Sequence, residues 1–341
     1  PQIGASKGQP QNGEALTAGS GAANTAARND AFAWNRTLEI ATAQNPGVNF
    51  IISAGDQVNK TGQAKEEEYA GYLSPAVLAG LPVATTIGNH DSLNPDYTYH
   101  FNNPNATENG KTQAGGDYYY SYGAGLFIVL NTNNYNVAEH EKTIQEAIAS
   151  APDAAWRVVT IHQDIYGTSL DHSDTDGMIL RTQLTPIFDK YDIDVVLQGH
   201  DHVYCRTYMM DGLNPIIDSD KYEYANGRDA APTAVNDPDG ILYVTANSGS
   251  GSKTYNIWTD VDFPFSAVQN QEHVANVSKV SVSDKQFTVT TYRTTDMSVV
   301  DSFTIKRDGG DETGSYTPAP TNDTRVTGYY DATGSLKLTL A

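Results

Sequence analysis

The stretch that decides the fold is "DIDVVLQGHDHVYCRTY", residues 192–208. An apolar run at 195–197 leads into Gly199, and His200 and His202 follow on either side of Asp201. Apolar and β-branched residues that end in glycine predict a buried strand with a loop at its carboxyl end. Two imidazoles in such a loop are either a chance placement or ligands of Zn, Fe or Mn, which neutral imidazole commonly binds. This loop alone leaves both interpretations open.

Three other apolar runs end in polar, ligand-type residues. They lead into Gly55-Asp56, into 88–91 with the sequence Gly-Asn-His-Asp, and into His162. Open α/β sheets form their sites at the carboxyl ends of their strands, so four such endings are expected to meet at one edge. Oxygen and nitrogen donors without thiolates suit Zn, Mn or Fe rather than an iron–sulfur cluster or a closed structural zinc site. The alternative, that these are satisfied turn and cap residues, requires four coincidences.

The order of the expected elements indicates the fold class. Helical spacing at 30–44, 64–80, 138–152 and 177–191 alternates with apolar strands, and from about 241 only strands are expected. Residues 1–27 contain almost no large apolar side chain and are expected to form a loop. Such a pattern predicts an α/β protein, a layered sandwich with two β-sheets in the middle and helices outside.

Composition excludes several classes of partner. The formal net charge of −20 argues against binding nucleic acid or an anionic membrane through the general surface. No run approaches the length of a membrane span. The single cysteine, Cys205, allows no internal disulfide and is expected to be buried. Low lysine content, many Thr, Asn, Tyr and Gly residues, and strong acidity suit an exported, extracellular or cell-surface protein of bacterial origin.

Several motifs together carry a family resemblance. "GDQVN", "GNHD", "VVTIH" and "GHDH", in this order, resemble the calcineurin-like metallophosphoesterases, and "YYYSYGAGLFIVLNTN" and "SGSGSKTYN" resemble their purple acid phosphatase-like branch. The likeness spans residues 1–306, expected to be the catalytic domain, and leaves 307–341 as a polar C-terminal extension or the start of a further segment. The resemblance implies a four-layer αββα sandwich with two mixed β-sheets.

The resemblance also implies residue roles. Asp56 would bridge two metal ions, Asn89, His162 and His200 would complete one metal site, and His202 would belong to the other. His90 would contact the substrate phosphate, with Asp91 as its orienting partner. His172 stands where purple acid phosphatases have a second substrate-pocket histidine, although a solvated loop histidine fits its sequence context equally well. For Arg206 we expect a structural ion pair.

The implied activity is hydrolysis of phosphate esters, with phosphomonoesters favoured, by water activated at two ions of Fe, Zn or Mn. A phosphodiesterase or nucleotide pyrophosphatase on the same site is the alternative, and a non-catalytic binding module on the same scaffold is a third hypothesis. The substrate in the first two cases is a small-molecule phosphoester.

The chain departs from the family pattern at two places. Purple enzymes have a tyrosine three residues after the bridging aspartate, where this chain has Asn59, so an iron–tyrosinate bond is not expected there. The family's first motif ends a central strand with an aspartate ligand, and residues 1–27 contain no apolar run that could form this strand. We therefore expect an N-terminal companion fragment, such as the other product of cleavage at an Asp-Pro bond, to supply the first central strand and the aspartate.

Overall fold

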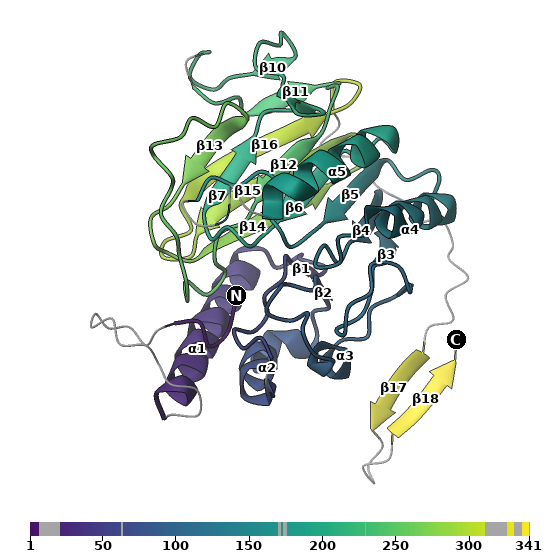
Figure 1. Cartoon of the computed structure of the whole chain (residues 1–341), viewed down its shortest axis with the longest axis vertical. Helices are drawn as coiled ribbons and strands as arrows, with labels where there is room; N and C mark the ends of the chain where they lie inside the picture. The colour runs from purple at the N-terminus through teal and green to yellow at the C-terminus, as the bar shows by residue number, and fades with distance from the viewer. Residues whose placement is uncertain are drawn as a thin grey trace.

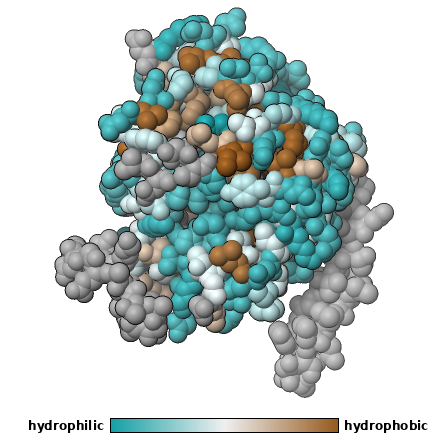
Figure 2. Space-filling model, in the orientation of Figure 1, coloured by the Kyte–Doolittle hydropathy of each residue, from teal (hydrophilic) through white to brown (hydrophobic). Residues whose placement is uncertain are grey.

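The computed structural model describes residues 1–6, 21–62, 64–169, 172, 176–228 and 230–310, and the strands 326–330 and 336–340. Two large β-sheets lie at the centre, helices lie outside them, and a small pair of strands lies close to the N-terminus (Figure 1). The face seen in Figure 2 is largely hydrophilic, as the acidic composition predicts. None of the described helices is long and apolar enough to cross a membrane.

The larger sheet has seven strands in the order β13-β7-β12-β6-β5-β4-β3. Its central strands β4, β5, β6 and β12 are parallel, whereas β3, β7 and β13 pair antiparallel, so the sheet is mixed. Parallel strands are covered on both faces, which explains why their sequences are near-continuous apolar runs. The strands are β3 (Tyr118–Tyr122), β4 (Gly125–Val129), β5 (Trp156–Thr160), β6 (Val195–Gln198), β7 (Tyr204–Thr207), β12 (Leu242–Thr245) and β13 (Ser266–Asn270).

One face of this sheet is covered by α4 (Val137–Ser150) and α5 (Asp176–Lys190) (Figure 1). Ile144 of α4 and Leu184 of α5 are fully buried in a core with Ile128 and Val196 of the sheet. Both helices were predicted from their apolar spacing, and the structure confirms them.

The second sheet has five strands in the order β10-β11-β16-β15-β14. Its inner face packs Phe287, Val289 and Phe303 against Val158 and Val244 of the first sheet, forming the inter-sheet core. Burial alternates along β15, as expected for a strand with one face toward a core. The strands are β10 (Tyr222–Glu223), β11 (Ala234–Asn236), β14 (Asn276–Val282), β15 (Gln286–Arg293) and β16 (Val299–Lys306).

The small sheet pairs β1 (Ile51–Ser53) in parallel with β2 (Val83–Thr85). Ile52 of β1 packs against the inter-sheet core, whereas Ile51 packs against the cluster formed with helix α1 (Gly21–Gln44). The pair therefore belongs to the same layer as the five-stranded sheet, with helices on its outer side. The remaining helices of this layer are α2 (Glu66–Leu73), the 3-10 helix η1 (Ala76–Ala79) and α3 (Asp96–His100). The predicted four-layer αββα sandwich is confirmed.

The expectation of a loop over 1–27 is wrong from Gly21 onward, where α1 begins. Ala26 and Ala27 are buried, and alanine is the best helix former, so the absence of large side chains did not indicate a loop.

Toward the C-terminus the strands of both large sheets end at Lys306, and among the described strands β17 (Val326–Tyr330) pairs only with β18 (Leu336–Leu340). A short hairpin also joins β8 (Met210–Asp211) to β9 (Asn214–Pro215). The division of the chain at 306 stays a prediction.

Candidate metal centre

The four predicted loops meet at the carboxyl ends of strands from both sheet layers. Asp56 follows β1, Asn89 and His90 follow β2, His162 follows β5, and His200 follows β6. The ligand atoms of Asp56, His162 and His200 all lie within 4.8 Å of one another. A single cation can therefore contact three side chains that are up to 144 residues apart in sequence (200 − 56).

The backbone around these residues is unusual. Asp56, His200 and His202 have φ angles of 47°, 65° and 53°, in the left-handed region that side-chain-bearing residues rarely adopt. Such conformations cluster at functional sites because surrounding contacts must impose them. The structure also explains why position 88 is a glycine: a Cβ atom there would lie 2.1 Å from Oδ1 of Asp56. A residue with a side chain at 88 would displace the carboxylate.

Asp56 and His162 form the buried centre of the site. Nδ1 of His162 donates to the carbonyl of Ala54 at 2.8 Å, which leaves Nε2 facing Asp56 Oδ1 at 3.4 Å and Asn89 Oδ1 at 3.0 Å. Although burial disfavours the charged carboxylate, the charge of His162 holds the pKa of Asp56 well below its usual value. Asp56 is thus an anion, and its Oδ1 also accepts the backbone N–H of His90 at 3.0 Å.

His200 and His202 are held as neutral imidazoles. Nδ1 of His200 lies 3.1 Å from Nε2 of His162, and burial together with that neighbour holds the pKa of His200 well below its usual value. His202 donates from Nδ1 to the carbonyl of Lys253 at 3.0 Å, and burial, followed by the charge of Lys253, lowers its pKa to about 3. Neutral imidazole is the form that binds metal, and the partner of one ring nitrogen fixes which nitrogen is available.

The donor set fits metal ions. Asp56 provides carboxylate oxygen, Asn89 amide oxygen, and His162 and His200 provide nitrogen within hydrogen-bonding distance of one another. Polar atoms packed this closely need a shared cation or proton between them, because buried charges and lone pairs are otherwise unfavourable. His202 follows His200 by two residues, and its ring packs on that of Tyr255 at 5.2 Å, as the ring of His172 does at 5.0 Å. These residues would hold Zn, Fe or Mn.

His90 borders the centre without belonging to the three-residue cluster. Its Nδ1 contacts the carbonyl of Asn59, its Nε2 lies 3.1 Å from Nε2 of Gln2, and the same Nε2 is 3.9 Å from Asp56 Oδ2. The side chain keeps 19% of its surface exposed, so a ligand from solvent can reach it. This position suits a residue that contacts substrate.

Asp91, predicted to orient His90, is fully buried and holds the loop rather than the ring. Its carboxylate accepts the backbone N–H groups of Gly88 at 3.0 Å and Gln57 at 3.3 Å and the hydroxyl of Tyr69 at 3.1 Å. Burial and the nearby charge of Asp56 raise the pKa of Asp91 to about 7. Any influence of Asp91 on His90 therefore passes through the backbone of the loop 88–91.

His172 lies in the site. Its ring centroid is 4.0 Å from that of His200, and its Nε2 is 3.3 Å from the hydroxyl of Tyr255. The structure therefore places His172, which had the weaker sequence match, next to the candidate metal ligand His200. Arg206, by contrast, forms the expected ion pair, with Nε 2.6 Å from Asp301 between the two sheets.

Comparison with known proteins agrees with this geometry. The family model described as calcineurin-like phosphoesterase matches residues 28–204, a little over half of the chain and all the site loops from Asp56 to His202. The chain belongs to the calcineurin-like phosphoesterase family.

Relatives of this phosphoesterase chain point to the purple acid phosphatase-like branch. Purple acid phosphatase 5 of Arabidopsis thaliana is 24% identical over 242 residues, which cover 69% of this chain and 54% of that protein. Fe(3+)-Zn(2+) purple acid phosphatase 12 of the same plant is 27% identical over 101 residues, 30% of this chain and 19% of that protein. The chain thus spans about half or less of the length of these relatives.

A solved structure shows the same fold. Purple acid phosphatase PPD1 from yellow lupin seeds superposes with a TM-score of 0.58 at 18% identity, covering 84% of this chain and 52% of that one. At this identity the similarity shows the fold alone.

Three residues of the phosphoesterase site were missed by the sequence reasoning. Buried Lys65 donates from Nζ to the carbonyls of His90 at 2.6 Å and Asp91 at 3.3 Å, Gln2 contacts His90, and Tyr255 packs edge-on against His202. Tyr255 lies within the quoted "SGSGSKTYN" motif, which was a usable signal. Lys65 and Gln2 lie in polar segments that have no pattern to single them out.

Proposed function

We propose that this chain hydrolyses phosphate esters at a two-metal centre and prefers phosphomonoesters. The observation that carries the proposal is the convergence of Asp56, His162 and His200 within 4.8 Å, with Asn89 Oδ1 3.0 Å from His162 and with His202 two residues after His200. Asp56 would contact both ions, Asn89, His162 and His200 would complete one site, and His202 would belong to the second. When bound, the cations would neutralise phosphate oxygens and acidify a water molecule.

The protein's own residues would position and protonate the substrate. His90 donates from Nδ1 to the carbonyl of Asn59, and its Nε2 lies beside Gln2 and 3.9 Å from Asp56; its ring is 19% exposed and would hydrogen-bond a phosphate oxygen. Protonated at Nε2, it would give a proton to the leaving oxygen, a role typically worth about 10²–10⁴-fold in rate. His172, beside His200 and Tyr255, would contact the opposite side of the substrate.

Local charge supports an anionic substrate despite the acidic chain. The formal net charge is −20, and two carboxylates face the clustered histidines: Asp56 and, 3.9 Å from His200, Asp176. Two bound divalent cations would carry more charge than these two carboxylates and would make the site positive. A phosphomonoester dianion would gain more from such a site than a diester monoanion, because attraction grows with ligand charge.

The test compares two substrates on one protein. The chain is stripped of metal, reconstituted separately with Zn, Fe or Mn, and assayed with p-nitrophenyl phosphate and with bis(p-nitrophenyl) phosphate. Faster metal-dependent hydrolysis of the monoester is expected. Preference for the bis-ester would favour the phosphodiesterase alternative, and bound metal without turnover of either ester would favour a binding module.

The metal is expected to lack a tyrosinate ligand at position 59. The side chain there is Asn59, so the iron-loaded protein should show no tyrosinate charge-transfer band in the visible range. Tyr255 is the tyrosine whose ring packs on both His172 and His202, at 5.0 and 5.2 Å. A purple sample that Tyr255→Phe bleaches would overturn the expectation and identify the ligand.

We also propose that the protein is exported by a bacterium and acts outside the cell or at its surface. Its acidity and low lysine content support this. Fractionation of the source cells followed by immunoblotting tests it, and recovery of the protein only from the cytosol would contradict it.

A further inference from the structure

A backbone carbonyl orients the ring of His90. Nδ1 of this ring contacts the carbonyl oxygen of Asn59, and because a carbonyl can only accept, Nδ1 must carry a proton. The partner of one imidazole nitrogen determines which role is left for the other nitrogen. Here Nε2 is left for other partners, and it lies 3.9 Å from Oδ2 of Asp56. The position of the Asn59 carbonyl therefore decides which nitrogen of His90 could meet a substrate.

A buried carboxylate holds the backbone that carries this carbonyl. Oε2 of Glu68 accepts the N–H of Asn59 and the N–H of Lys60, each at 2.8 Å. The Asn59 carbonyl and the Lys60 N–H belong to one planar peptide unit, so fixing the N–H also fixes the direction of the carbonyl. The N–H of Asn59 also reaches the carbonyl of Ile3 at 2.9 Å. We therefore expect Glu68 to act mainly through the bond from Lys60.

The same face of α2 also holds the loop that carries His90. Lys65, at the N-terminal cap of α2, donates from Nζ to the carbonyls of His90 at 2.6 Å and Asp91 at 3.3 Å. Tyr69 donates its hydroxyl to the carboxylate of Asp91 at 3.1 Å. Positions 65, 68 and 69 are three and four residues apart, which places them on one helix face, and all three side chains are buried. One face of α2 thus positions both the loop and the carbonyl that orients the ring.

We propose that Glu68 is a positioning residue for His90. By holding the peptide unit between residues 59 and 60, Glu68 keeps the proton of the ring on Nδ1 and leaves Nε2 as the nitrogen that meets the phosphate ester. The inference rests on the proposed role of His90 in hydrolysis. A residue that only stabilised the fold would not need His90 for its effect, whereas a positioning residue acts through the ring, and this difference can be measured.

The first test measures the tautomer of His90 without substrate. Zinc-loaded protein is prepared with isotopically labelled histidine, and the NMR signals of the ring nitrogens are assigned by comparison with His90→Asn. The wild type should show a proton bound to Nδ1 of His90. Glu68→Met, which keeps the length of the side chain but removes both oxygens, should give a mixture of tautomers. Glu68→Gln keeps one acceptor oxygen and should restore the wild-type signal.

The second test measures turnover in a double-mutant cycle. Glu68→Met should lower kcat for p-nitrophenyl phosphate at least about tenfold with bound metal retained, because a positioned proton donor is typically worth about 10²–10⁴-fold. In the His90→Asn background the same substitution should change kcat less than about twofold, because no ring is left to position. Glu68→Gln should recover most of the lost turnover. Glu67→Met, at an exposed glutamate of the same helix, is the control and should leave kcat unchanged.

Glu68→Asp replaces Glu68→Met if that variant fails to fold, because the shorter side chain keeps the charge but withdraws the carboxylate from the two N–H groups. An unchanged tautomer in the folded variant would overturn the proposal, and so would an equal loss of turnover with and without the His90 ring. Loss of bound metal from the variant would also overturn it, since Glu68 would then support the metal centre itself. If the wild type hydrolyses neither the monoester nor the bis-ester, the proposed function fails, and the NMR signal still decides whether Glu68 fixes the tautomer.

Discussion

Replacing Asp56 by asparagine tests the metal centre most directly. The substitution keeps the size of the side chain and the Oδ1 acceptor for the N–H of His90, so the loop should stay folded. It removes the negative charge of a residue that is only 5% exposed. The carboxylate that carries this charge lies within 4.8 Å of ring nitrogens of His162 and His200. A unit charge about 4 Å from a cation, at an effective dielectric constant of about 20, is worth roughly 4 kcal/mol per cation charge. Since 1.4 kcal/mol is about tenfold, each cation charge accounts for about three orders of magnitude, so the affinity for a divalent ion should fall by at least that much.

The assay measures bound metal and affinity in parallel. Wild-type and Asp56→Asn proteins are loaded, passed through gel filtration, and analysed by inductively coupled plasma mass spectrometry, with affinities from chelator competition. We expect nearly two ions in the wild type and the loss of at least one in the variant. Asp153→Asn is the matched control, because Asp153 is exposed and precedes β5, at the opposite end of that strand from His162. Equal metal content in wild type and Asp56→Asn would refute the bridging role and with it the two-metal model.

Three further outcomes are expected. His90→Asn should lower turnover about 10²-fold or more while the bound metal is retained. The control His273→Asn changes an exposed histidine and should leave turnover and metal content unchanged. Loss of metal from His90→Asn would show that His90 is a ligand. Asp301→Ala should destabilise the fold by about 3–5 kcal/mol in urea unfolding, because it leaves Arg206 buried without its partner, and a loss under 1 kcal/mol would contradict this. Cys205 is buried and its pKa is raised to about 12, so at pH 8 it stays a thiol and should react with Ellman's reagent only after unfolding; rapid labelling of the native protein would contradict its burial.

The sequence by itself determined most of the fold and the candidate metal ligands. The apolar runs before Asp56, Asn89, His162 and His200 are local signals, because a buried strand requires continuous apolar residues and a sharp loop at its end requires glycine. The carboxyl ends of parallel strands meet at one edge, so the convergence of these residues also followed from the sequence. The prediction of a loop was wrong for residues 21–27. Their composition of small residues is typical of a loop, but they form the first turns of α1.

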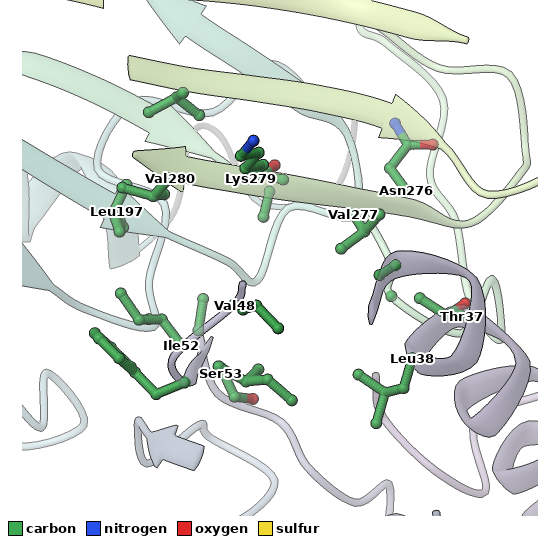
Figure 3. Close-up of a pocket in the computed structure, with 18 of the residues that line it drawn as sticks. Thr37, Leu38, Val48, Ile52, Ser53, Leu197, Asn276, Val277, Lys279 and Val280 are labelled. Carbon is green, nitrogen blue, oxygen red and sulfur yellow. The ribbon is translucent and has the colours of Figure 1, made fainter. Parts of the chain in front are cut away.

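Only the tertiary structure decided how the site is supported and which distant segments come together. Gln2 contacts His90 across 88 residues, and Lys65 reaches the same loop across 25 residues. No local sequence pattern predicts either contact, because the packing of the layers, and not the neighbouring residues in the chain, determines which distant side chains meet. A pocket of about 720 Å³ (Figure 3) is the clearest case, because residues from 34–54 and 276–282 line it and these segments come together only after the sandwich has closed.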